Sequence, residues 1–181
     1  PMTSTDSLPF PTRAHLHLLG LAPSQTGRPP TGLPWYEEID LQPPAMQALR
    51  WHLATPGRWR GGWLFGRPAS ETVLQVEVAG ASAYPDWDVD VLEGDRRYLL
   101  GQADLLRTLR PDLDWVGNWI ICPDNGLPSA GEAEELVQEA HRMGIVHEGY
   151  ALLIVGLSHD HPTGLLCRCA DEAVDLLQFR L

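Results

Sequence analysis

The sequence predicts an α/β fold, built as a single domain around a mixed β-sheet. Patterns typical of helices and of strands alternate along the chain, as in a sheet covered by helices. Ala151–Leu157 is almost continuously apolar, which is typical of a strand buried on both faces. The length of 181 residues is that of one domain with a substantial core.

The N-terminal part, residues 1–44, is rich in Pro, Ser, Thr and Gly and is predicted to be an extension of the main domain, residues 45–181. Within the extension, Arg13–Leu21 partly alternates between apolar and polar residues, so we expect one strand there. The main domain is expected to open with a helix over Ala45–Thr55, because two prolines precede this segment and Pro56-Gly57 ends it.

The middle of the chain predicts three strands and a helix. Gly61–Gly66 is expected to be a buried strand, and its first two glycines indicate a close backbone approach. Thr72–Ala79 and Asp86–Leu92 alternate in polarity and are predicted to be further strands. Leu99–Leu109 has leucines at three- and four-residue spacing, which predicts a helix.

The C-terminal part predicts a second helix of this kind between strands. Gly131–Met143 has an apolar stripe, and Ser129 followed by Glu132 forms the pattern of a capping box at its start. Strands are expected at Trp115–Ile121, Ala151–Leu157, Leu165–Ala170 and Val174–Phe179, with a polar turn at Ser158–Gly164. The whole pattern predicts a mixed sheet flanked by about three helices.

Composition excludes several functions. The formal net charge is -11, all 13 basic residues are arginine, and lysine is absent. We therefore expect no nucleic-acid partner, no Schiff-base chemistry and no Walker-type phosphate loop. The sequence has no apolar run of membrane-spanning length and no signal-peptide pattern. Together with three cysteines, this predicts a cytoplasmic protein with no membrane partner.

Two neighbouring segments carry the most informative motif. Val116–Pro123 reads Val-Gly-Asn-Trp-Ile-Ile-Cys-Pro, and Leu127–Glu132 reads Leu-Pro-Ser-Ala-Gly-Glu. They resemble the signature of the JAB/MPN (JAMM, Mov34/PAD-1-like) family, Val-Gly-Trp-Tyr-His-Ser-His-Pro followed by Pro-Ser-x-x-Asp. The likeness extends over about residues 45–170, because Trp59–Gly66 is similar to the family's Glu-x-Gly-Gly-x-Leu-x-Gly strand. It implies the bacterial type of this fold, which has a cytidine-deaminase-like mixed sheet.

The resemblance also implies where a zinc site would lie. In the family, two histidines and an aspartate bind zinc, and a glutamate takes a proton from the metal-bound water. The glutamate position holds Trp59, the two histidine positions hold Ile120 and Cys122, and the aspartate position holds Glu132; Ser129, which would support the oxyanion, is retained. Ile120 has no lone pair, and Cys122 with Glu132 alone would not make a tight site. We therefore expect that there is no cofactor, and that Trp59 and Ile120 fill and dry the former metal pocket.

These expectations lead to a function in protein binding. A JAB/MPN-like domain without its zinc site is expected to be catalytically inactive and to act as a protein-binding or scaffold subunit. By resemblance, the partner is a ubiquitin-like protein or an active JAB/MPN homologue, in a bacterial ubiquitin-like or sulfur-carrier pathway. A dimer is compatible with this hypothesis.

Two alternatives stay open. The chain could be a hydrolase of ubiquitin-like proteins with a displaced centre, using Cys122 with Glu132, or using His159 and His161 as weak metal ligands. It could also be a small-molecule binding module that uses the apolar remnant of the cleft.

Several other residues were candidates for chemistry and have structural interpretations. His15 and His17 are interpreted as packing or surface residues, and Cys167 and Cys169 as small buried thiols. Of the seven tryptophans, Trp35 and Trp87 are the better candidates for a partner surface. The other five are expected by default to pack in the core; they are Trp51, Trp59, Trp63, Trp115 and Trp119.

Overall fold

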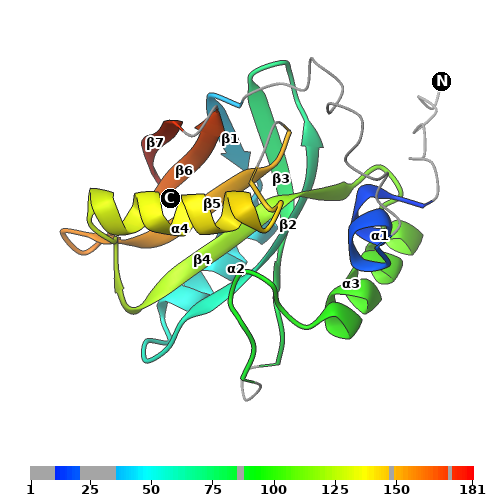
Figure 1. Cartoon of the computed structure of the whole chain (residues 1–181), viewed down its shortest axis with the longest axis horizontal. Coiled ribbons are helices and arrows are strands. Elements are labelled where there is room, and N and C mark those ends of the chain that lie inside the picture. The colour runs from blue at the N-terminus through cyan, green and yellow to red at the C-terminus, as the bar shows by residue number, and fades with distance from the viewer. Residues whose placement is uncertain (1–10, 21–35, 85–87, 147–148, 171–172) are drawn as a thin grey trace.

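The computed structural model describes residues 11–20, 36–84, 88–146, 149–170 and 173–181. In this part of the chain, seven strands form one curled sheet and four helices pack on it (Figure 1). The strands are β1 (Glu38–Leu41), β2 (Arg60–Pro68), β3 (Val73–Ala81), β4 (Asp114–Gly126), β5 (Ala151–Ser158), β6 (His161–Ala170) and β7 (Ala173–Arg180). The helices are α1 (Arg13–Leu18), α2 (Pro43–Leu53), α3 (Arg96–Leu109) and α4 (Ala130–Arg142).

The sheet is mixed, in the order β1-β3-β2-β4-β5-β6-β7. β4 lies at its centre, antiparallel to β2 and parallel to β5. The edge strand β1 runs parallel to β3, and the remaining pairs are antiparallel. The predicted α/β class with a mixed sheet is therefore confirmed.

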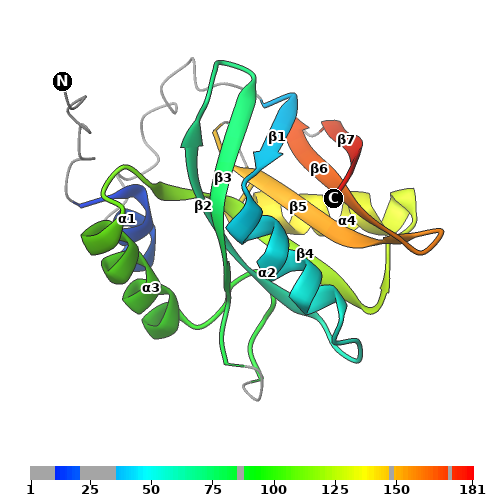
Figure 2. The ribbon, with the colours of Figure 1, turned by 180° about the vertical axis from the view of Figure 1, so that it is seen from behind.

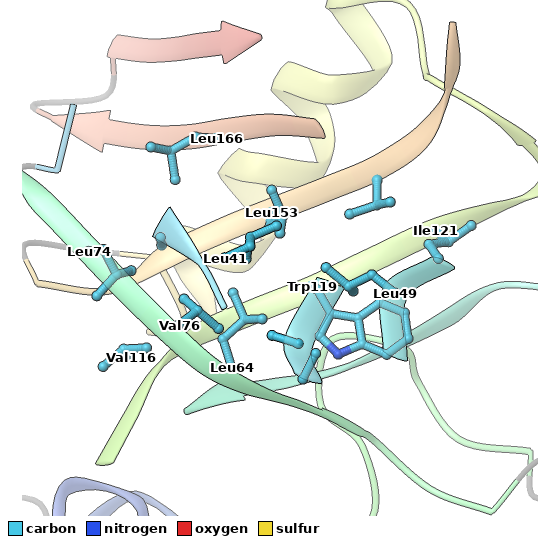
Figure 3. Close-up of a cluster of buried hydrophobic side chains, with 14 of the residues drawn as sticks. Leu41, Leu49, Leu64, Leu74, Val76, Val116, Trp119, Ile121, Leu153 and Leu166 are labelled. Carbon is cyan, nitrogen blue, oxygen red and sulfur yellow. The ribbon is translucent and has the colours of Figure 1, made fainter. Parts of the chain in front are cut away.

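Helices cover both faces of this sheet. α2 lies on one face (Figure 2), and α1, α3 and α4 lie on the other (Figure 1). Because side chains alternate along a strand, Trp119 and Ile121 of β4 pack in the α2-side cluster (Figure 3), whereas Ile120 packs with Ala133 and Val137 of α4. Alternate side chains of the motif strand β4 therefore belong to two hydrophobic cores, one on each face of the sheet.

Two predicted strands are wrong. Arg13–Leu18 forms the helix α1 instead of a strand, and it brings the number of helices to four. The carboxylate of Asp114 accepts the backbone N–H groups of Arg13 and Ala14, a long-range contact that polarity alternation cannot reveal. Of the predicted strand Asp86–Leu92, residues 86–87 lie outside the described residues. The described part, residues 88–92, forms no strand, because Asp90 accepts the N–H groups of Leu92 and Glu93 and folds this segment into a turn.

The helix starts follow the sequence closely. Ser129 caps α4 as part of a capping box with Glu132, as predicted. Asp95 caps α3 by accepting the N–H of Tyr98, so this helix begins three residues before the predicted start. The strand β1 was not predicted; it has four residues and is stabilised by parallel pairing with β3.

Candidate functional site

Three of the motif positions meet at one end of β4. Trp59, Cys122 and Glu132 line a hollow of about 830 Å³ between the end of β4 and the start of α4. Its lining includes the apolar side chains of Leu127 and Leu136. We call it the acidic hollow, because its charged lining residues are Asp124, Glu132, Glu135 and Glu139, against a single Arg142.

Ile120 is not among the residues that line this hollow; it is fully buried in the α4-side core. It pairs with Gly61 of β2 and Ile154 of β5 and is therefore held from both sides by the sheet. This agrees with the expectation that Ile120 contributes apolar bulk at the motif. Trp59 behaves differently, because its side chain is 44% exposed. The expectation that Trp59 fills and dries a closed pocket is therefore wrong.

Cys122 is a buried residue of the acidic hollow. Burial, together with the negative charges of Asp124 and Glu132, raises the pKa of its thiol to about 11. A nucleophilic cysteine needs the opposite shift, usually from an adjacent imidazole or a cation. No histidine is among the described residues that line this hollow. Cys122 is thus a neutral thiol at physiological pH.

Glu132 is already engaged in the cap of α4. Its carboxylate accepts the backbone N–H of Ser129 at 2.8 Å and the Ser129 hydroxyl at 2.7 Å. These hydrogen bonds lower the pKa of Glu132. Ser129 and Glu132 therefore satisfy each other's hydrogen-bonding groups at the first turn of α4. Their role here is structural.

A second hollow lies on the other side of Trp59, and we call it the aromatic hollow. Its volume is about 400 Å³, and Trp59 lines it together with Trp51, Tyr84 and Tyr98. The side chains of Trp51 and Tyr84 are 63% and 57% exposed. Default core packing is therefore wrong for Trp51 and Trp59, whereas Trp63, Trp115 and Trp119 are buried as expected. Trp35 and Trp87 lie outside the described residues.

His52 lies at the boundary between the aromatic hollow and the α2-side core. Its ring centroid is 4.7 Å from that of Trp119. Burial, and to a smaller extent the positive charge of Arg60, lowers the pKa of His52 to about 4. The imidazole is therefore neutral at pH 7.

Sequence reasoning missed Arg60, which lines the aromatic hollow and contacts the backbone of Cys122, a residue of the acidic hollow. Its guanidinium donates to the carbonyl of His52 in the last turn of α2, to that of Thr55 just after the helix, and to the Cys122 carbonyl at 2.7 Å. It also donates to the side chain of Asn125 at 2.5 Å, whose own amide donates to the Leu53 carbonyl at 2.7 Å. We call this set of contacts the Arg60 hub. Asn125 has a positive φ of 62° and lies in the irregular last part of β4, between Ile121 and Gly126.

The alternative metal ligands His159 and His161 do not share a strand face. His159 and Asp160 form a two-residue hairpin turn with positive φ angles of 49° and 63°, and Ser158 pairs with His161 across it. The i and i+2 spacing of the two histidines suggested a shared face of an extended segment, but the turn lies between that segment's strands and removes this arrangement. In the described part of the chain, no three His, Cys, Asp or Glu side chains gather closely enough to hold a metal ion.

The remaining candidates lie elsewhere. His15 is buried against α3 and His17 lies on Trp115, so both have packing roles as interpreted. Cys167 is a buried thiol, and burial raises its pKa to about 12. The side chain of Cys169 lies outside the described residues. No helix among the described residues is both long and apolar enough to cross a bilayer.

Comparisons with known proteins support the fold and leave the function open. The sequence matches no protein-family profile and no curated protein. The structure is similar to the solution structure of protein DSY2949 from Desulfitobacterium hafniense, with a TM-score of 0.52 and 19% identity. The match covers 77% of this chain and 89% of that one. At this identity the likeness shows a shared fold alone.

Proposed function

We propose that this chain is a non-catalytic JAB/MPN-like domain that binds a protein partner through the surface around Trp59. The observation that carries the proposal is the gathering of Trp51, Trp59 and Tyr84 around one hollow, all substantially exposed. Exposed large aromatic side chains beside a hollow are typical of interfaces, where tryptophan and tyrosine supply much of the binding energy.

The chemistry of the motif positions supports a function without catalysis. Ile120 is buried and offers no ligand atom, Cys122 is a neutral thiol, and Glu132 is engaged in a helix cap. A hydrolase of this family would need a metal-bound water and a base at these positions. Binding is therefore the function that this arrangement supports best.

The resemblance suggests the class of partner. It is a ubiquitin-like or sulfur-carrier protein, or an active homologue of the same family. The acidic hollow favours a partner that presents a basic patch, because Asp124, Glu135 and Glu139 would attract it at short range.

The binding surface is tested by titrating the chain with a bacterial ubiquitin-like protein in a calorimeter. Trp59→Ala should weaken binding by about tenfold or more, because truncating a central aromatic anchor typically costs about 1.4 kcal/mol or more. Leu105→Ala is the control, since Leu105 is also an exposed apolar residue, lies on α3 away from this hollow, and should leave affinity unchanged when it is replaced. Equal affinities for wild type and Trp59→Ala would contradict the proposed surface.

The absence of catalysis is tested separately. Protein purified without chelators should carry no stoichiometric zinc by elemental analysis, and it should not cleave a ubiquitin-like fusion substrate. Stoichiometric zinc would overturn the proposal. Cleavage that disappears in Cys122→Ala would favour the hydrolase with a displaced centre instead.

A further inference from the structure

The aromatic hollow has walls of aromatic side chains that come from separate parts of the chain. Trp51 belongs to α2 and Trp59 lies just before β2. Tyr84 and Tyr98 line the hollow as a pair, with 4.9 Å between their ring centroids. The volume of about 400 Å³ is in the size range of pockets that bind small molecules. Walls of this kind are suited to a flat apolar ring.

The charge of this hollow is opposite to that of the whole chain. The described residues that line it include two arginines, Arg58 and Arg60, and no aspartate or glutamate. The chain as a whole has 24 acidic residues against 13 arginines. On the other side of Trp59, the acidic hollow is lined by four carboxylates and one arginine. The aromatic hollow therefore favours a ligand with a negative charge.

The two arginines lack a counter-ion. Neither is paired with a carboxylate in the described part of the chain. The contacts of the Arg60 hub are carbonyls and the side chain of Asn125, all of them uncharged. Burial, and to a smaller extent the charge of the exposed Arg58, lowers the pKa of Arg60. A bound anion would relieve this repulsion between like charges.

Two uncharged polar side chains of the hollow have no hydrogen-bond partner among the described residues: the hydroxyl of Ser82 and the imidazole of His52. Ser82 is only 7% exposed, and its backbone groups are engaged with Gly61 and Asp95 at 2.8 and 2.9 Å. Neutral His52 has one ring nitrogen that donates and one that accepts. Because buried polar groups are normally hydrogen-bonded, these two side chains are available to a ligand.

We propose that the aromatic hollow binds a small aromatic acid, a molecule with a flat ring that carries a carboxylate. The ring packs against Trp51 and Trp59, and the carboxylate pairs with Arg58. Ser82 and His52 donate hydrogen bonds to the oxygen atoms of the ligand. Such a ligand needs no protein partner, so this site goes beyond the proposed protein contact and does not rest on it.

Three indole derivatives of similar size separate the effect of the ring from that of the charge. At pH 7, indole-3-acetate is an anion, indole-3-ethanol is neutral and tryptamine is a cation. Each is titrated into isotope-labelled full-length protein, and the side-chain N–H signals of Trp51 and Trp59 are followed by nuclear magnetic resonance. We expect indole-3-acetate to shift these signals to saturation, with a Kd on the order of 1 mM or tighter. Tryptamine should bind at least about fivefold more weakly, and indole-3-ethanol with intermediate affinity.

The variant Arg58→Gln tests the pairing with the carboxylate. It should weaken the binding of indole-3-acetate about fivefold or more and leave that of indole-3-ethanol unchanged, because only the anion pairs with the guanidinium. Arg180→Gln is the matched control, since it removes the same charge from an exposed residue of β7 that does not line the hollow. Trp51→Ala removes part of the aromatic wall and should weaken the binding of both ligands.

Three results would overturn the proposal: no saturable shift with any of the three ligands, equal affinities for indole-3-acetate and tryptamine, or an unchanged affinity for indole-3-acetate in Arg58→Gln. The comparison of ligands uses the wild-type chain, so it decides the question even if a variant does not fold. Failure of all three ligands to bind, together with a protein partner whose affinity falls in Trp59→Ala, would refute the ligand site and leave the proposed protein contact standing.

Discussion

Cys122 shows how the surroundings of one residue decide what it can do. With a pKa of about 11, the thiol should be ionised to roughly a thousandth or less at pH 7.5. We expect iodoacetamide to modify Cys122 far more slowly than a free cysteine, with a rate that rises steadily up to about pH 11. Mass spectrometry of timed samples measures this, and urea-unfolded protein, in which all three cysteines react, is the control. Rapid modification of the folded chain at pH 7.5 would show that Cys122 is activated.

His52 predicts how stability depends on pH. Its folded-state pKa of about 4 lies below the usual 6.5, so between these values the unfolded chain binds a proton that the folded chain does not. The stabilisation associated with neutral His52 is present above pH 6.5 and is lost as the pH falls toward 4. For this partly solvated ring we expect a loss of about 1–2 kcal/mol in the free energy of unfolding.

Urea unfolding at pH 7 and pH 4.5 measures this loss, and His52→Gln is the matched variant. Glutamine cannot be protonated in this range, so the variant should lose less stability than the wild type between the two pH values. An equal loss in both proteins would assign the acid sensitivity to other groups.

At the scale of elements, two glycines make opposite predictions. A Cβ at Gly62 of β2 would overlap the carbonyl oxygen of Gly80 on β3, whereas a Cβ at Gly101 of α3 would meet no atom within 4 Å. Gly62→Ala should therefore force β2 and β3 apart and lower the free energy of unfolding by about 3 kcal/mol or more. Gly101→Ala should raise it by about 0.5–1 kcal/mol, because alanine favours the helix. Denaturant unfolding compares them, and similar effects would refute the close approach of β2 and β3.

The elements that could be predicted are those whose residues carry a local signal, such as apolar periodicity or a capping pattern. Ala151–Leu157 and the capping box at Ser129 are continuous local signals, and both lie where expected. The helix α1 could not be predicted, because it is stabilised by Asp104 and Asp114, about a hundred residues away. The strand β1 was missed for the same reason, because it is stabilised by pairing with β3, which is distant in the sequence.

The candidate site was predictable only in part. The motif located Cys122 and Glu132 on one hollow, as their positions in the chain suggested. The exposure of Trp51 and Trp59 was not predictable. Trp51 lies on a helix and Trp59 beside a strand, and tryptophans at such positions usually pack in the core. The Arg60 hub needs three carbonyls from two segments that are far apart in the sequence, residues 52–55 and Cys122, and no sequence pattern indicates that arrangement.

For the whole molecule, net charge is the dominant electrostatic property. Its 24 acidic residues outnumber 13 arginines, so self-repulsion should destabilise the folded state at low ionic strength. We expect the melting temperature to rise by a few degrees between about 10 mM and 0.5 M sodium chloride, as screening weakens this repulsion. Differential scanning calorimetry measures it. A melting temperature that falls with salt would show that surface ion pairs, such as Arg110 with Asp112 and Glu77, outweigh the repulsion.

The Arg60 hub has a consequence for the rate of complex formation. Trp59 directly precedes Arg60. The Arg60 guanidinium is held by acceptors at the end of α2 and at the end of β4, so the backbone beside this tryptophan is fixed before a partner arrives. A surface held in this way needs no slow rearrangement on encounter. Stopped-flow traces of tryptophan fluorescence should therefore follow a single exponential, with an observed rate that increases linearly with partner concentration and does not reach a plateau.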